Sequence, residues 1–314
     1  MNTGSHVLVV GSANIDVSVT ARTLPRRGET TVGTSSVISI GGKGANQAAA
    51  AAACGASTQL IARVGTDEFG RMVREELSAR SIGIVETRAL EDTGTGVAAI
   101  YVEESGDNCI VVVPGANAKL APGDIDAALP LVRDAAVVVV QCEIPLETVY
   151  RTIELAAENN VPVILNPAPF HSLDLARIAR CVTYLIPNET EASQLCGMPV
   201  ETVSEAKQCA SWLHELGIPC VIVTLGAQGC VVADKESVRH VSAYRVKAVD
   251  TTGAGDAFIG CLAESLAAGR VLDDSIRRAV IYSALSTTAR GALASFPRRD
   301  EVSARIDSAL AGAS

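Results

Sequence analysis

The sequence predicts an α/β protein in which helices flank a doubly wound, mostly parallel sheet and a small β-sheet forms a lid. The first observation is that short apolar strands alternate with helices from about residue 115 onward. The second is that residues 14–40 and 96–113 break into short β pieces that could form one separate sheet. The third is that polar or glycine-rich residues follow nearly every main strand, at the edge where open α/β sheets bind ligands.

The N-terminal part begins with a buried strand at residues 6–10, which a glycine ends. Residues 17–19 and 30–32 have the composition of short strands. Between the two β patches, residues 45–55 are so rich in alanine that they predict a helix.

A β-hairpin is predicted where two apolar runs at 97–102 and 109–113 flank a polar turn at 104–108. We therefore assign residues 14–40 and 96–113 to the small lid. The large domain takes the remainder of the chain, which is residues 1–13, 41–95 and 114–314.

The later part of the chain alternates strand and helix with little between them. Residues 220–225 are apolar throughout, as expected for a strand covered on both faces. The other strands are expected at 136–140, 162–165, 182–186 and 245–249. The helices are expected at 146–159, 204–216, 256–268 and 275–289.

Composition narrows the classes of partner. The chain has 314 residues, of which 48% are hydrophobic, so it can bury a sizeable core. Its formal net charge of −9 argues against a nucleic-acid partner or an acidic membrane surface, since both require basic surface. No apolar stretch is long enough to span a bilayer, and the N-terminus lacks the layout of a signal peptide. We expect a cytoplasmic protein with no membrane partner.

The nine cysteines are odd in number, scattered, and contain no Cys-x-x-Cys spacing. Several lie inside apolar runs. We therefore expect small, buried, reduced side chains in a reducing compartment.

The strongest chemical signal is the segment 250–256 (DTTGAGD), which comes directly before an apolar helix. Two glycines allow successive N–H groups to point at one spot, and the helix N-terminus makes that spot electropositive. Such an anion hole suits the charge on a phosphoryl group in transfer. Asp256 stands beside it, where a carboxylate can accept a proton from an attacking hydroxyl. The alternative is that Asp256 only caps the helix.

The second signal is the segment 41–47 (GGKGANQ), which leads into the alanine-rich helix. It is not a phosphate-binding Walker loop, because Gly44 occupies the Ser/Thr position. Nor do residues 253–260 form a dinucleotide fingerprint, because Phe258 stands where the third glycine belongs. The glycines at 41 and 42 permit close approach to a small ligand, with Lys43 and Asn46 as donors. The alternative is a flexible loop capped by Asn46.

Six motifs together resemble the ribokinase family (the pfkB type) of carbohydrate kinases, in order and spacing, over nearly the whole chain. They are residues 11–16 (GSANID), 41–48 (GGKGANQA), 166–169 (NPAP), 188–191 (NETE), 223–226 (VTLG) and 250–258 (DTTGAGDAF). Within the family the chain is most similar to the ribose kinases. The resemblance implies transfer of the γ-phosphate of ATP to the 5-hydroxyl of D-ribose, giving D-ribose 5-phosphate.

The resemblance also implies roles for individual residues. Asp256 would be the catalytic base, and the anion hole would be Gly253, Ala254 and Gly255. The sugar would be held by Asn14, Asp16, Gly42, Lys43, Asn46 and Glu143. The ATP site would comprise Asn188, Thr224, Leu225, Gly226, Ala227, Gln228 and Gly229, together with Gly255.

Two cations and a second subunit are implied in the same way. Glu191 would act on Mg²⁺ through water, since Mg²⁺ usually keeps part of its hydration shell. A monovalent cation, K⁺, would lie beside Asp250, Thr252, Ser286, Ala289, Gly291 and Ser295. The lid would close over the sugar and pair two subunits as a homodimer. No positive group for the leaving phosphate is evident, because Lys43 is assigned to the sugar.

Other functions remain open. The segments 146–150, 197–200 and 257–261 also resemble 2-deoxyribose kinases, whereas Asn14 and Asp16 offer the polar partners that a 2-hydroxyl needs. An oxidoreductase would need a glycine fingerprint after the first strand, which the sequence lacks. A non-catalytic sugar-binding protein is expected to have lost the base, and Asp256 is present.

Overall fold

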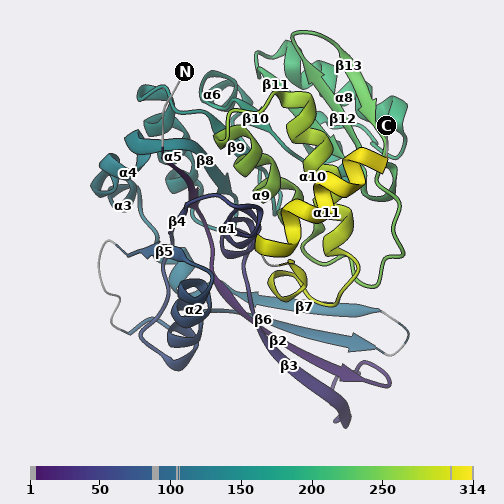
Figure 1. Ribbon diagram of the computed structural model, residues 1–314. Coiled ribbons are helices and arrows are strands. Elements are labelled where there is room, and N and C mark those ends of the chain that lie inside the picture. Colours follow the sequence, from purple (N-terminus) through teal and green to yellow (C-terminus); the bar gives the residue numbers. More distant parts are fainter. Residues whose placement is uncertain (1–4, 87–91, 104, 106, 298, 313–314) are drawn as a thin grey trace.

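The large sheet of this computed structural model has nine strands among the described residues, which are 5–86, 92–103, 105, 107–297 and 299–312 (Figure 1). Its strands are parallel from β11 to β5, and an antiparallel pair, β12 and β13, completes one edge. In spatial order they are β13 (Val238–Val241), β12 (Cys230–Asp234), β11 (Cys220–Thr224), β10 (Tyr184–Leu185), β9 (Val163–Asn166), β8 (Ala135–Gln141), β1 (His6–Val10), β4 (Thr58–Ile61) and β5 (Ile82–Val85).

Helices cover both faces of this sheet. Side chains alternate along β1, so Val7 and Val9 face one core while Leu8 and Val10 face the other. The first core, toward the viewer in Figure 1, packs against α1 (Lys43–Cys54), α2 (Glu68–Ala79), α9 (Ala254–Ala267), α10 (Leu272–Ser286) and α11 (Arg299–Gly312). The second packs against α3 (Pro122–Ala127), α4 (Leu129–Asp134), α5 (Leu146–Glu158), α6 (Leu175–Cys181), α7 (Glu189–Cys196) and α8 (Val203–Glu215). Of the helices described, not one has the length and hydropathy needed to cross a membrane.

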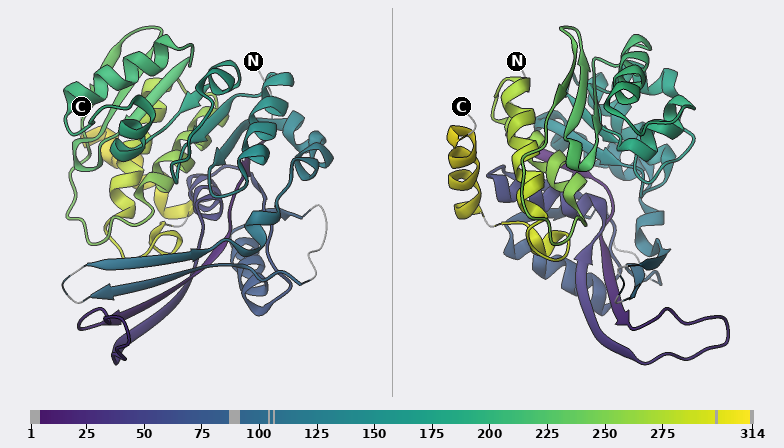
Figure 2. Two further views of the ribbon diagram at one scale, coloured as in Figure 1. Left: turned by 180° about the vertical axis from the view of Figure 1, so that it is seen from behind. Right: turned by 90° about the vertical axis from the view of Figure 1, so that its right-hand side faces the viewer.

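A second, small sheet projects from the body of the molecule (Figures 1 and 2). Its spatial order is β3 (Gly33–Gly41), β2 (Asn14–Ala21), β6 (Gly96–Glu103) and β7 (Asn108–Val113). The outer pairs are antiparallel and the central pair, β2 with β6, is parallel. The predicted fold class is therefore confirmed, including the hairpin of β6 and β7. The predicted turn of that hairpin includes Glu104 and Gly106, which lie outside the described residues.

Two predicted strands are wrong. Residues 30–32 lie in the connection between β2 and β3, because Ala21 already pairs with Gly33 and leaves them no partner. A β-prone composition does not make a strand without a neighbour to pair with. Residues 245–249 have no regular structure either. They run past α10, where the N–H groups of Val249 and Asp250 both donate to the carbonyl of Thr287.

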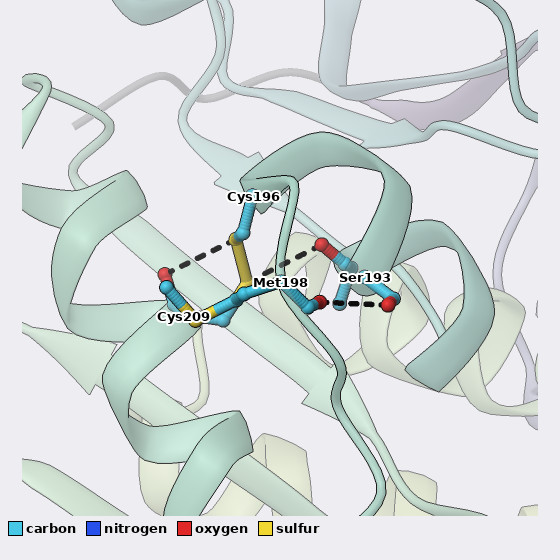
Figure 3. Close-up of a disulfide and its surroundings, with 5 residues drawn as sticks. Ser193, Cys196, Met198 and Cys209 are labelled. Carbon is cyan, nitrogen blue, oxygen red and sulfur yellow. Dashed lines mark hydrogen bonds between the residues drawn. A yellow bond between two sulfur atoms is a disulfide. The ribbon is translucent and has the colours of Figure 1, made fainter.

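The cysteines also depart from expectation, because Cys196 and Cys209 form a disulfide (Figure 3). Cys196 ends α7 and Cys209 lies within α8, and the left-handed Gly197 turns the chain between them. The two helices pack together and bring the Cα atoms to 6.0 Å, within the range for a disulfide. Their spacing of 13 residues carried no such signal. Of the free thiols, Cys109 on β7 is exposed, and most of the others are buried.

Candidate active site

At the start of α9, where the anion hole is predicted, two backbone N–H groups are free to donate hydrogen bonds. Gly253 precedes the helix with φ +76°, and a Cβ there would lie 2.7 Å from the Cβ of Ala292, so only glycine fits. The N–H of Ala254 donates to the carbonyl of Thr251 at 3.2 Å. The N–H groups of Gly255 and Asp256 have no acceptor in the described part of the chain. They lie at the positive end of the helix dipole and can bind an anion.

Asp256 is buried at this helix start, and two amides of α1 orient its carboxylate. Asn46 Nδ2 donates to Asp256 Oδ2 at 3.0 Å, and Gln47 Nε2 donates to Oδ1 at 2.9 Å. Burial raises the pKa of Asp256, although Lys43 and the two amides oppose that shift. The result is a fixed carboxylate with an elevated pKa, which suits a general base.

A chain of buried amides supports this carboxylate from behind. Gln141 Nε2, at the end of β8, donates to Gln47 Oε1 at 2.7 Å. Gln47 Nε2 also donates to Asn166 Oδ1 at 3.2 Å, and Asn166 Nδ2 donates to the carbonyl of Ile186 at 3.0 Å. Sequence-based reasoning gave Gln47, Gln141 and Asn166 no role. The usable signal was the position of Gln141 and Asn166 at the carboxyl ends of parallel strands.

Lys43, the first residue of α1, lies among carboxylates. Burial alone would lower its pKa, but Asp256, Glu143 and Glu191 outweigh it and the pKa is raised, so the ammonium stays charged. Lys43, Glu191 and residues 253–256 line one cavity of about 170 Å³. Lys43 therefore places a positive charge in the same cavity as the start of α9.

Asn188 and Glu191, which line the same cavity, are hydrogen-bonded to each other. The N–H and Nδ2 of Asn188 each donate to the Glu191 carboxylate at 2.9 Å, and Asn188 Oδ1 accepts from the Glu191 N–H at 2.9 Å. Burial raises the pKa of Glu191. Within the described ranges, no three or more His, Cys, Asp or Glu side chains gather as a metal-binding group.

Further acidic and amide side chains lie on β2 and beside the start of α1. Asn14 and Asp16 share one face of β2. Burial, with Glu143 and Asp256 nearby, raises the pKa of Asp16 to about 6. Glu143 accepts from Ser12 Oγ and, at 3.0 Å, from the N–H of Lys43. Four of the predicted sugar-binding residues thus lie near Asp256: Asp16, Lys43, Asn46 and Glu143.

Gly42, directly before α1, allows the start of this helix to pack against the start of β2. Its φ is +90°, and a Cβ there would lie 2.9 Å from both the Cα of Ala13 and the backbone nitrogen of Asn14. Only glycine allows the loop before α1 to approach the start of β2 this closely.

A larger cavity of about 400 Å³ adjoins the first one, and the two share Thr224, Thr251, Ala254 and Gly255. Among the predicted ATP-site residues, Gly226, Ala227 and Gly229 also line it. The other two predicted residues, Leu225, which is packed in the core, and Gln228, do not line this cavity. The sequence did not predict its other walls, which are mostly apolar: Ala243, Tyr244, Arg245, Val246, Ala248, Phe258, Val280, Ser283, Ala284 and Thr287.

The predicted cation loop is partly assembled. Asp250 Oδ2 accepts from the N–H of Gly291 at 2.8 Å, and Oδ1 accepts from the N–H of Thr252 at 2.9 Å. These hydrogen bonds outweigh partial burial and lower the pKa of Asp250. The remaining predicted ligands are Ser286 at the end of α10, Ala289, and Ser295 in η3 (Leu293–Ser295). The hydroxyls of Ser286 and Ser295 donate to the carbonyls of Ser283 and Ala292.

The fold and the site define a class of enzyme, a phosphotransferase acting on a sugar hydroxyl. Comparison with known proteins gives the family. Residues 5–299 match the pfkB family of carbohydrate kinases. The chain is 37% identical over 292 residues to the deoxyribokinase of Salmonella typhi, which covers 93% of this chain and 95% of that protein. It is 35% identical over 293 residues to the ribokinase of Haemophilus influenzae, with the same coverage.

Solved structures agree. The Arabidopsis thaliana ribokinase complexed with ribose and ATP superposes with a TM-score of 0.87 at 32% identity, covering 96% of this chain and 99% of that one. The chain belongs to the pfkB family of carbohydrate kinases and is a sugar kinase of the ribokinase type. The family, the fold and the reaction class predicted from the sequence are confirmed.

Proposed function

We propose that this enzyme transfers the γ-phosphate of ATP to the 5-hydroxyl of D-ribose, with Asp256 as the base. The observation that carries the proposal is the buried Asp256 carboxylate, which stands beside two free N–H groups and opens on the same cavity as Lys43. A base, an anion hole and a fixed positive charge at one point are what phosphoryl transfer to a hydroxyl requires.

ATP fits the two adjoining cavities. The larger, mostly apolar one has room for the adenosine, and the smaller, polar one for the phosphates. Gly255 lines both, so its N–H lies where the phosphate chain would pass. The Arabidopsis ribokinase was solved with ribose and ATP bound, which supports the same pair of substrates here.

In the proposed reaction the sugar hydroxyl gives its proton to Asp256 as its oxygen bonds to the γ-phosphorus. The bond from that phosphorus to the β,γ-bridging oxygen breaks, and ADP leaves. The N–H groups of Gly255 and Asp256, with Lys43, stabilise the charge on the transferred group. The amides of Asn46 and Gln47 keep the Asp256 carboxylate turned toward the sugar.

The residues present fit the two cations of the proposal. Mg²⁺ would neutralise phosphate charge, and Glu191 would reach it through water, since both oxygens of that carboxylate are already bonded to Asn188. K⁺ would take carbonyl oxygens near Asp250, whose carboxylate already orders the Thr252 and Gly291 backbone. Chelating Mg²⁺ is expected to abolish ADP release, and replacing K⁺ by a bulky organic cation to slow it, both in a coupled assay.

Ribose is proposed over 2-deoxyribose because Asn14 and Asp16 face the sugar space with polar groups. A site built to bond a hydroxyl rejects the analogue that lacks it, because its buried polar groups are left unpaired. The relatives include both a deoxyribokinase and ribokinases. Turnover of the two sugars at equal concentration tests the choice.

The small sheet is proposed to be a lid that closes over the sugar and pairs two subunits. Apolar side chains stand exposed on it: Val37, Ile38, Tyr101, Ile110, Val111, Val112 and Val113. Exposed apolar patches of this kind mark interfaces. A cytoplasmic location remains part of the proposal, and the Cys196–Cys209 disulfide is the observation against which it has to be tested.

The decisive variant is Asp256→Asn. It keeps the shape of the side chain but cannot accept the proton, so kcat is expected to fall by roughly three orders of magnitude or more. Ribose binding, measured by calorimetry, should persist. A near-normal rate would show that Asp256 is not the base. Ribose binding without ADP release from the unmodified enzyme would instead favour a non-catalytic sugar-binding protein.

A further inference from the structure

Asn117 is a residue outside the predicted site, and its side chain is hydrogen-bonded to the backbone just before β2. It lies in η1 (Gly115–Lys119) and is only 1% exposed. The N–H of Ala13 donates to Asn117 Oδ1 at 3.0 Å, and Asn117 Nδ2 donates to the carbonyl of Ala13 at 3.2 Å. A backbone N–H can only donate and a carbonyl can only accept, so the Asn117 amide has a single possible orientation.

That orientation determines the orientation of the next amide. Asn117 Nδ2 also donates to Asn14 Oδ1, at 2.7 Å. The oxygen of Asn14 must therefore face Asn117, and its Nδ2 must face away. Among the residues that the structure describes, none accepts a hydrogen bond from this nitrogen. Asn14 is 5% exposed, but its Nδ2 is not fully enclosed by protein, so a ligand can reach this nitrogen and accept its hydrogen bond.

Close packing holds the two amides together. A Cβ on Gly96 would lie 2.2 Å from Asn14 Oδ1 and 2.4 Å from Asn117 Nδ2. The backbone of β6 thus passes directly beside this hydrogen bond, and Gly96 pairs with Asn14 in the small sheet. Little room is left for either amide to move aside.

We propose, on the basis of the proposed ribose kinase activity, that Asn117 is a positioning residue that makes Asn14 a hydrogen-bond donor to the sugar. Asp16, two residues further along the same face of β2, supplies an acceptor. One hydroxyl can accept from Asn14 and donate to Asp16 at once. A sugar without that hydroxyl leaves the Asn14 donor unpaired, so the pair selects ribose over 2-deoxyribose.

The test is the ratio of kcat/KM for ribose to that for 2-deoxyribose. Asn117→Ala frees the Asn14 amide to turn its oxygen toward Asp16, where two acceptors would compete for one hydroxyl hydrogen. We expect the ratio to fall about tenfold, mainly through the KM for ribose. In an Asn14→Ala background, Asn117→Ala should leave the ratio unchanged. If the Ala variant does not fold, Asn117→Asp, which can still accept from the Ala13 N–H but cannot donate to Asn14, gives the same readout.

Thr148→Val is the matched control. Thr148 is buried and its hydroxyl donates to the carbonyl of Leu120, just beyond η1, at 2.7 Å. Its loss should lower Tm without changing the sugar ratio. A ribose-selective parent enzyme whose ratio is the same after Asn117→Ala overturns this inference alone. A parent that prefers 2-deoxyribose overturns both this inference and the choice of ribose, and a parent that uses neither sugar overturns the proposed function itself.

Discussion

At Asp16 the proposed role in sugar binding and the stability of the folded protein are opposed. Its pKa is raised to about 6 in the folded protein, against 3.8 as the ordinary value. Between these values the folded protein holds more protons at Asp16 than the unfolded chain does. The free energy of unfolding therefore falls as pH rises through this window, and the full cost is present above pH about 6.

Replacing Asp16 with Asn should therefore stabilise the ligand-free protein at neutral pH. The gain is expected to be at most about 3 kcal/mol, from the size of the shift, and to disappear toward pH about 4. Thermal unfolding at a series of pH values measures it. The same variant should bind ribose more weakly above pH about 6, with a flatter dependence of affinity on pH. A lower Tm at neutral pH would contradict this account of Asp16.

Gly253 and Gly255 stand two residues apart and should respond differently to alanine. A Cβ on Gly253 meets Ala292, and its φ of +76° is unfavourable for alanine, so Gly253→Ala should lower Tm by several degrees. A Cβ on Gly255 meets nothing within 4 Å but would enter the cavities assigned to ATP. Gly255→Ala should leave Tm unchanged and raise the KM for ATP about tenfold or more. Equal loss of stability in both variants would argue against a ligand-facing Gly255.

At the scale of elements, the disulfide joins the helix that carries Asn188 and Glu191 to its neighbour (Figure 3). It closes a loop of 13 residues, a size for which a native disulfide contributes about 3 kcal/mol. A reductant should therefore lower Tm by several degrees. The double variant Cys196→Ser/Cys209→Ser should have the lower Tm from the start and no longer respond to reductant. A parent protein whose Tm ignores reductant would contradict the prediction.

The disulfide also provides a check on location. Structural disulfides are rare in cytosolic proteins of most organisms, where thiols are kept reduced. Alkylation of freshly lysed cells, followed by mass mapping of Cys196 and Cys209, shows which state the protein has in its own compartment.

The elements with strong local patterns were predictable from the sequence. The alanine-rich α1, the amphipathic α8 and the apolar β11 lie where expected, and so do the glycines and carboxylate at the start of α9. The failures involve partners distant in sequence. Residues 30–32 lack a pairing strand, and residues 245–249 serve as a cavity wall, which no local composition reveals.

The site shows the same limit. Asp256 could be predicted because its glycines and helix are adjacent in the chain. Asn117 could not, because it acts on Ala13 from 104 residues away. The sequence predicts that Lys43 binds the sugar, and it does not reveal that Lys43 also lines the smaller cavity with Glu191. The path of the folded backbone determines which distant residues meet, whereas a sequence pattern describes mainly one helix or strand at a time.

At the scale of the whole molecule, the small sheet leaves an apolar edge strand uncovered. All described residues of β7 are exposed, and Ile110 is 54% exposed. Edge strands of this kind pair with other chains unless they are protected. Ile110→Lys should shift the protein from dimer to monomer in analytical ultracentrifugation. Val271→Lys is the control, because Val271 is 72% exposed but lies on the large domain. A monomeric parent protein would contradict the proposed dimer.

Three strands of the small sheet, β2, β3 and β6, join the large domain side by side at one end of the sheet. Asn14 is in register with Gly41 on one side and with Gly96 on the other. Any swing of the small sheet about this end must carry Asn14 and Asp16 with it, while Asp256 stays with the body of the enzyme. Sugar occupancy and sheet orientation are then linked equilibria, each shifting the other by the same factor. If the proposed lid closes, ribose would favour the sheet orientation in which Asp16 lies near Asp256, and the same coupling would make that orientation bind ribose more tightly.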